Sequence, residues 1–171
     1  MELIDAILGR RSIRKYKEKD VEDEKIRKIL EAAIWAPSSG NTQTWRFYIV
    51  RDERIKRELS ASALNQRHIR ESPVVIVVGY DMQEMYSAYR ERGVTLYAIQ
   101  DAAAATQNML LRAYDLGLGT CWVGAFDENE VSRILDLPKY VRPVAIVTVG
   151  YLAERGVSTR KSLESVVKFV G

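Results

Sequence analysis

An unbroken apolar run in the middle of the chain, Val-Val-Ile-Val-Val-Gly at 74–79, restricts the possible folds more than any other stretch. Its β-branched side chains favour an extended strand. The run has no polar side to turn towards water, which is the pattern of a strand buried on both faces. We therefore predict that 74–79 lies centrally in a β-sheet.

Hydrophobic periodicity and turn residues place further elements around this strand. Additional strands are expected at 47–50, 120–123 and 143–151. Helices are expected at 3–8, at 22–35, from Asp52, at 96–116 and from Asp127. The last of these is predicted to open with a capping box, because Glu130 follows Asp127 by three residues.

Two segments fit more than one structure. In 81–93 polar and aromatic residues alternate, and the pattern fits either a helix or a loop. The C-terminal segment 152–171 carries Leu163, Val166 and Phe169 among other apolar residues. Since such a segment is too apolar to remain in water, we expect it to pack on another surface, for which a second subunit is one candidate.

Composition restricts the class of protein. The 171 residues, 47% hydrophobic and 29% charged, fit a single globular domain over 1–171. A net charge of +3 is too small for bulk nucleic-acid binding and no apolar run is long enough to span a bilayer, so neither nucleic acid nor membrane is an expected partner. The N-terminus lacks a signal-peptide pattern and Cys121 is the only cysteine, so we expect a cytoplasmic location.

A cluster of arginines follows the first expected helix. Arg10, Arg11, Ser12 and Arg14 stand in a loop, and Arg160 provides a further guanidinium near the other end of the chain. Guanidinium groups match phosphate oxygens bidentately, so this set is suited to bind a phosphate. A solvated basic loop is the alternative, because charged runs are ordinary on protein surfaces.

Other catalytic chemistry has little support. His68 is the only histidine, so neither a nucleophile system nor a metal site is expected. No Walker sequence is present, and Trp122 stands where the dinucleotide fingerprint needs its third glycine. A chain with phosphate donors but no evident acid, base or nucleophile indicates that a cofactor carries the chemistry.

Four motifs occur in a characteristic order along the chain: 10–14; 36–43 followed by Trp45 and Phe47; 117–119 leading to 124–126; and Arg160. In this order they resemble the nitroreductase family of FMN-dependent NAD(P)H oxidoreductases. The resemblance implies an α+β fold with a central, mostly antiparallel or mixed sheet flanked by helices. It also implies an intertwined homodimer with two FMN sites at its interface.

The resemblance implies a set of cofactor-binding residues: Arg10, Arg11, Ser12, Arg14, Pro37, Ser38, Ser39, Asn41, Gln43, Asn65, Gly124, Ala125 and Arg160. By position, Arg10, Ser12 and Arg160 would hold the phosphate and ribityl chain. The segment 37–41 would come from the partner subunit. No catalytic side chain is implied; Arg14, near the flavin N1 and O2, and the backbone of Gly124 and Ala125, near N5 and O4, would tune the flavin.

His68 and the pair Tyr86 and Tyr89 each keep two interpretations. His68 falls where some relatives carry a basic group near the flavin O2, but an ordinary histidine on a surface helix is equally compatible with the sequence. Tyr86 and Tyr89 fit a lid over the flavin or a cover on the neighbouring subunit. Cys121 is expected to be a small buried residue without an activated thiolate.

The reaction implied by the resemblance is a ping-pong hydride transfer. NADH or NADPH would reduce FMN, and a small electron acceptor such as a nitroaromatic, quinone or free flavin would reoxidise it. Reductive dehalogenation or flavin fragmentation on the same fold is an alternative. A flavin-binding module without turnover, or a basic interaction domain without a cofactor, belongs to a different class of function.

Overall fold

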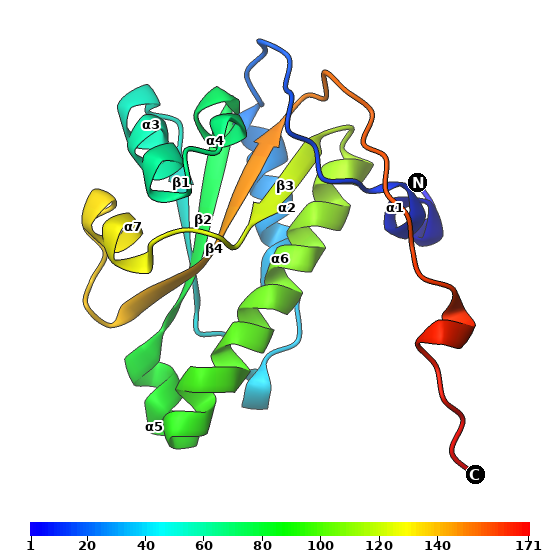
Figure 1. Cartoon of the computed structure of the whole chain (residues 1–171). Coiled ribbons are helices and arrows are strands. Elements are labelled where there is room, and N and C mark those ends of the chain that lie inside the picture. Colours follow the sequence, from blue (N-terminus) through cyan, green and yellow to red (C-terminus); the bar gives the residue numbers. More distant parts are fainter.

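The computed structural model describes residues 1–171 (Figure 1). The helices are α1 Leu3–Gly9, α2 Asp23–Ile34, α3 Glu53–Ser62, α4 Arg67–Glu71, α5 Met82–Arg92, α6 Ala98–Asp115 and α7 Glu128–Ile134. The strands are β1 Trp45–Val50, β2 Val74–Asp81, β3 Gly119–Val123 and β4 Val141–Gly150. Short 3₁₀ turns occur at Ser39–Asn41 and Leu163–Ser165, and one π-helical turn at Gly93–Tyr97 joins α5 to α6.

The strands form one sheet in the order β1-β2-β4-β3, and every neighbouring pair is antiparallel. All eight residues of β2 are buried between β1 and β4, which confirms the central position predicted for the apolar run. The β2–β4 register shifts between Val78 and Gly79. At this bulge a Cβ on Gly79 would lie 2.8 Å from the Arg142 carbonyl oxygen, so the close approach of the strands requires glycine.

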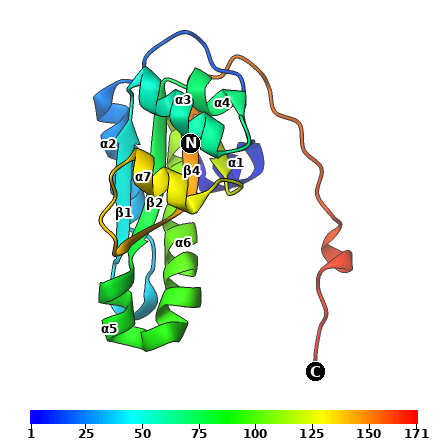
Figure 2. The ribbon, with the colours of Figure 1, turned by 60° about the vertical axis from the view of Figure 1, so that its left-hand side comes forward.

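Alternate residues of β2 contribute to two separate cores. Val74, Ile76 and Val78 point to one face, where α2 and α6 cover the sheet. Val75 and Val77 point to the other face and pack with residues of α3, α4 and α7. Figures 1 and 2 show the resulting arrangement, with the sheet between these two groups of helices. The observed fold is therefore the α+β arrangement expected from the sequence.

The N-terminal arginine segment covers part of the free edge of β3. Ile13 N–H donates to the Thr120 carbonyl at 2.9 Å, and Ser12 forms an isolated parallel bridge with Thr120. On its other side the segment pairs with the chain that follows β4, since Ala153 N–H donates to the Lys15 carbonyl at 3.0 Å. The loop expected at 10–14 is thus an extended segment held between two distant parts of the sequence.

Segment 81–93, whose sequence fitted either a helix or a loop, is mainly helical. Asp81 caps α5 by accepting hydrogen bonds from the N–H groups of Gln83 and Glu84 at 3.0 and 2.9 Å. The helix is kinked at Arg90, whose φ of 55° lies in the left-handed region. No helix of the protein combines the length and apolar character needed to cross a bilayer.

The predicted capping box at α7 is only half formed. Asp127 accepts hydrogen bonds from the N–H groups of Asn129 and Glu130, as the motif requires. The Glu130 carboxylate, however, pairs with Arg133 at 2.8 Å, and the Asp127 N–H donates to the Ser62 carbonyl at 2.9 Å. The predicted reciprocal hydrogen bond, from the Asp127 N–H to the Glu130 side chain, is wrong because both groups have other partners.

The C-terminal segment extends away from the rest of the chain (Figures 1 and 2). Val157 and Phe169 are each 94% exposed, and Leu163 and Val166 are also largely in solvent. The apolar face of α1, with Leu3 and Leu8, is exposed as well. No surface of the same chain covers the C-terminal segment, so packing on a second subunit stays a prediction.

The register of the sheet supplies a test of the core. Ile76 on β2 and Ile49 on β1 are directly paired, but Ile76 is fully buried whereas Ile49 is 42% exposed. Ile76→Ala should lower the free energy of unfolding by about 2 to 5 kcal/mol, because it opens a cavity in the core. Ile49→Ala removes the same atoms from a half-exposed site and should cost clearly less. Urea denaturation at fixed protein concentration measures both; equal losses would contradict the burial described.

Candidate functional site

Four arginines gather beside β3 without any carboxylate partner. Arg10, Arg11, Arg14 and Arg160 take part in no ion pair. Eight other arginines are paired with acidic side chains: Arg27, Arg46, Arg51, Arg54, Arg67, Arg112, Arg133 and Arg142. Five arginines elsewhere, Arg57, Arg70, Arg90, Arg92 and Arg155, are also unpaired, so what distinguishes the cluster is the proximity of its like charges to Arg10.

Burial and neighbouring positive charges both affect the pKa of the Arg10 guanidinium. Partial burial lowers the pKa of Arg10, and the positive charges of Arg160 and Arg11 lower it further. Arg160 comes from the far end of the sequence, where its Nη1 donates to the Ser158 hydroxyl at 2.9 Å. The structure thus brings Arg10 and Arg160 near each other, and an anion bound beside them would offset their charge.

The burial of Ile13 explains why the side chains of Ser12 and Arg14 face outward. Its side chain is 2% exposed and packs against Gly119, where an added Cβ would lie 2.9 Å from the Ile13 side chain. Side chains alternate along an extended segment, so Ser12 and Arg14 turn away from this contact. Both are exposed. The nearest described carboxylate, Glu154, accepts from the Arg14 backbone N–H at 2.8 Å and leaves the guanidinium unpaired.

A second group of polar atoms lies where β3 ends. The Ala125 carbonyl accepts from Gln66 Nε2 at 3.4 Å, which connects this end of β3 to the turn between α3 and α4. Asn65 lies in that turn with a φ of 55°. Gly124 and Ala125 are exposed, and neither of their backbone N–H groups donates a hydrogen bond within the chain. They are two free backbone donors on the surface.

His68 lies in α4 next to this group and is not the surface histidine that one interpretation of the sequence allowed. It is 5% exposed, and its Nε2 has no hydrogen-bond partner. Burial lowers the pKa of the imidazole, the Arg14 guanidinium lowers it further, and Glu71 acts in the opposite direction. Cys121 is buried, as expected, and burial raises the pKa of its thiol.

The polar loop 37–43 lies at the other end of α6. Ser39 donates to the Asp101 carboxylate in the first turns of α6, from its N–H at 3.1 Å and from its hydroxyl at 3.0 Å. Near the opposite end of the helix, Tyr114 packs against Gly9, where an added Cβ would meet its hydroxyl. Thirteen residues separate Asp101 from Tyr114, which is about 20 Å of helix.

This separation divides the predicted site into two groups. One group contains Arg10, Arg11, Ser12, Arg14, Asn65, Gly124, Ala125 and Arg160, and the other contains Pro37, Ser38, Ser39, Asn41 and Gln43. Within the loop, Gln43 N–H donates to the Ser38 hydroxyl and Gln43 Nε2 to the Asn41 side chain, both at 3.1 Å. The two groups do not meet within one chain.

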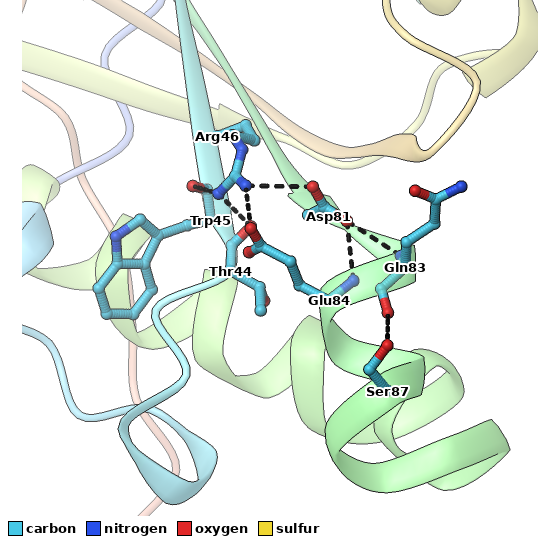
Figure 3. Close-up of polar contacts among 7 residues, drawn as sticks. All are labelled: Thr44, Trp45, Arg46, Asp81, Gln83, Glu84 and Ser87. Carbon is cyan, nitrogen blue, oxygen red and sulfur yellow. Dashed lines mark hydrogen bonds and ion pairs between the residues drawn. The ribbon is translucent and has the colours of Figure 1, made fainter.

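The start of α5 is clamped to the start of β1 (Figure 3). Arg46 Nη2 contacts the Asp81 carboxylate at 3.1 Å and the Glu84 carboxylate at 3.0 Å. The Thr44 carbonyl accepts from both Arg46 Nη1 and the Asp81 N–H, at 3.2 and 2.8 Å. Loop 37–43 and α5 are consequently held together at the point where each leaves the sheet.

An aromatic side chain of α5, Tyr89, packs against loop 37–43. An added Cβ on Gly40 would lie 2.1 Å from the Tyr89 hydroxyl, so the ring lies directly against the loop. Tyr89 also makes an edge contact with Tyr97, with ring centroids 5.4 Å apart. Tyr86 and Tyr89 are 48% and 37% exposed. Both the lid and the subunit-cover interpretation of these tyrosines remain predictions.

The Nitroreductase family profile matches residues 7–151. The chain belongs to the nitroreductase family. The resemblance identified from the four sequence motifs is thereby confirmed.

Two curated relatives of this nitroreductase-family chain illustrate the match. A Thermus thermophilus protein named NADH dehydrogenase is 38% identical, over 95% of this chain and 93% of the relative. A Bacillus subtilis protein named FMN reductase [NAD(P)H] is 32% identical, over 90% of this chain and 67% of the relative. A Desulfovibrio desulfuricans protein solved in complex with FMN is 35% identical, with a TM-score of 0.87 over 100% of this chain and 98% of the other.

Several residues of the nitroreductase site region were not singled out from the sequence. Asp101 and Arg46 anchor loop 37–43 and α5, and Gln66 contacts the carbonyl next to the free N–H groups. The Thr42 and Thr44 hydroxyls of the loop are buried without a partner. Ion pairs between distant strands and helices have no signature in sequence spacing, so only the structure could identify these residues.

The clamp on α5 can be tested by removing the cap of α5 and, as a control, the cap of α3. Asp81→Ala removes the cap of α5 and the buried partner of Arg46, so amide hydrogen exchange should accelerate in 82–92. The cap alone is worth about 0.5 to 2 kcal/mol. Asp52→Ala, which removes the exposed cap of α3, serves as the matched control and should affect only 53–62. Unchanged exchange in 82–92 of the Asp81 variant would contradict the clamp.

Proposed function

We propose that this chain is an FMN-dependent NAD(P)H oxidoreductase that reduces small electron-poor acceptors such as nitroaromatics, quinones or flavins. Relatives named NADH dehydrogenase and FMN reductase, and a related structure holding FMN, support the enzyme class and the cofactor. The observation that carries the proposal is the arginine cluster beside β3, which has no carboxylate partner. A bound anion would offset this charge, and the phosphate of FMN is such an anion.

The other polar atoms fit the remaining parts of FMN. Arg10, Arg11, Ser12 and Arg160 would hold the phosphate end. Arg14 and the free N–H groups of Gly124 and Ala125 would face the ring, whose polar edge needs hydrogen-bond donors. Bound FMN supplies the hydride chemistry, while the protein binds and orients the ring. The Arg14 guanidinium would stabilise negative charge that develops on the ring during reduction.

The division of the site along α6 supports a homodimer. Because about 20 Å of helix separates loop 37–43 from the arginine cluster, one flavin cannot contact both groups of a single chain. The loop of a second copy would complete the site. Exposed apolar surface is available for this assembly, including Trp35 at 86% exposure, the face of α1 and the C-terminal segment.

Catalysis by ping-pong turnover follows from the same architecture. The sheet is antiparallel throughout, so this fold offers no dinucleotide-binding βαβ unit as a separate nicotinamide site. Donor and acceptor would therefore use the same face of the flavin in turn. The single domain over 1–171 and the cytoplasmic location also stay predictions.

The proposal is tested on the purified protein. We expect a yellow protein that releases FMN on denaturation, behaves as a dimer by light scattering and oxidises NADH or NADPH with a quinone. Double-reciprocal plots at several quinone concentrations should be parallel. A bound flavin without turnover would favour the non-catalytic module, a colourless protein would favour the basic interaction domain, and intersecting plots would contradict ping-pong turnover.

Arg160→Ala tests the phosphate assignment. A hydrogen bond to a charged group is worth about 1.5 to 3 kcal/mol, so FMN affinity should fall by roughly ten- to a hundredfold. Affinity for riboflavin, which lacks the phosphate, should hardly change. Titration of the apoprotein with both ligands measures this, and Lys168→Ala, in the exposed part of the same segment, is the control. Equal losses for both ligands would show that Arg160 acts through folding or assembly instead.

A further inference from the structure

Asp101, in the first turns of α6, is a buried carboxylate without a cationic partner. It is 6% exposed and takes part in no ion pair of the chain. Its hydrogen-bond donors are both on Ser39: the N–H lies 3.1 Å from each carboxylate oxygen, and the hydroxyl lies 3.0 Å from one of them. A buried carboxylate is unfavourable unless such bonds satisfy it. Asp101 therefore depends on the position of Ser39 in loop 37–43.

The bonds to Asp101 are the only hydrogen bonds that join residues 37–43 to the rest of the chain. Every other hydrogen bond of these residues stays within the loop, including those from Gln43 to Ser38 and Asn41. Beyond the end of the loop, the chain is fixed by the clamp between β1 and α5 (Figure 3). Within the loop itself, Asp101 is the one polar anchor.

The backbone of the loop needs such an anchor. Gly40, Asn41 and Gln43 have φ of 55°, 58° and 51°, all in the left-handed region. Glycine adopts this region freely and asparagine tolerates it, but for most other residues it is unfavourable. Three such residues within four positions persist only where surrounding contacts hold them. Asp101 on α6 and the Tyr89 ring on α5, which packs against Gly40, supply those contacts.

The anchored loop presents other side chains to solvent. Ser39 is half-buried against Asp101, whereas Pro37, Asn41 and Gln43 are exposed. The arginine cluster of the same chain lies about 20 Å of helix away, so one flavin cannot contact both. In the proposed homodimer, the flavin next to these exposed side chains is therefore bound by the arginines of the other copy.

We propose that Asp101 is a positioning residue that acts on the flavin site of the partner subunit. Its carboxylate fixes Ser39, and Ser39 fixes the conformation in which loop 37–43 meets the ring held by the other copy. This inference rests on the proposed FMN site and homodimer. Because Asp101 acts through the loop, loss of its hydrogen bonds should weaken binding of the ring and leave the phosphate contacts intact.

Two substitutions separate the hydrogen bonds of Asp101 from its charge. Asp101→Ala removes every bond to Ser39, so flavin affinity should fall by roughly tenfold, equally for FMN and riboflavin because the phosphate is not involved. Asp101→Asn keeps one oxygen, which can accept from both Ser39 donors as Oδ1 does, and should recover most of the affinity. Asp52→Ala, which removes a hydrogen-bonded carboxylate at the start of α3, is the control and should bind both flavins like the wild type.

Titration of each apoprotein with FMN and with riboflavin measures these affinities. A loss confined to FMN, no loss in Asp101→Ala, or an Asp101→Asn variant as weak as Asp101→Ala would each overturn the inference. If Asp101→Ala does not fold, Asp101→Leu takes its place, because it keeps the buried volume and also removes both acceptors. The same loss for both flavins is then expected.

A mixed dimer tests whether Asp101 acts on the partner. One chain carries Asp101→Ala and the other Arg160→Ala, with different tags so that only the mixed species is purified. If the loop acts in the partner's site, one site of this dimer contains both substitutions and the other contains neither. Half of the sites should then bind FMN with wild-type affinity.

The opposite result is equally distinct. If Asp101 acts within its own chain, or only on overall stability, every site of the mixed dimer is impaired and none has wild-type affinity, which would overturn the inference. A wild-type protein that binds FMN as a monomer by light scattering would overturn it too, while the assignment as an FMN-dependent enzyme stands. A wild-type protein that binds no FMN, seen from its visible spectrum, would overturn the proposed function itself.

Discussion

The site depends on the backbone pairing that holds the N-terminal segment between β3 and the chain after β4. Ile13 N–H bonds to Thr120, and Lys17 N–H bonds to the Tyr151 carbonyl, each at 2.9 Å. These bonds join residues more than a hundred positions apart. The buried Ile13 side chain fixes which side of the segment faces the core, and the arginines are consequently presented on the surface.

Several ion pairs hold elements of the scaffold together, whereas Arg10, Arg11, Arg14 and Arg160 of the proposed site take part in none. Glu128 pairs with Arg142 at 2.7 Å, and Asp81 and Glu84 share Arg46. The Glu128–Arg142 and Glu84–Arg46 pairs each join a helix to a strand, and the Asp81–Arg46 pair joins β2 to β1. The cluster around Arg10, by contrast, combines partial burial with like charges, which is unfavourable until an anion is present. Binding an anionic cofactor would therefore also stabilise this part of the fold.

The length of α6 is the structural basis of the proposed homodimer. The helix packs against the sheet and α2 along its length, so it cannot shorten without loss of the main core. It separates loop 37–43, anchored at Asp101, from the arginine cluster near Tyr114. The same geometry leaves the apolar faces of α1 and the C-terminal segment without a cover in one chain.

The sequence by itself determined most of the elements, because local rules govern them, but it left 81–93 open and did not indicate α4. The β-branched run of β2 identified the central strand, and Asp52 and Asp127 marked helix starts, since hydrophobic period and capping act over a few residues. The order of the sequence motifs was sufficient to identify the family and the α+β fold. Only the tertiary structure decided that His68 is buried without a partner, that Arg46 clamps α5, and that the site residues form two separate groups. Burial and pairing depend on contacts between segments far apart in the chain, and spacing along the sequence carries no record of them.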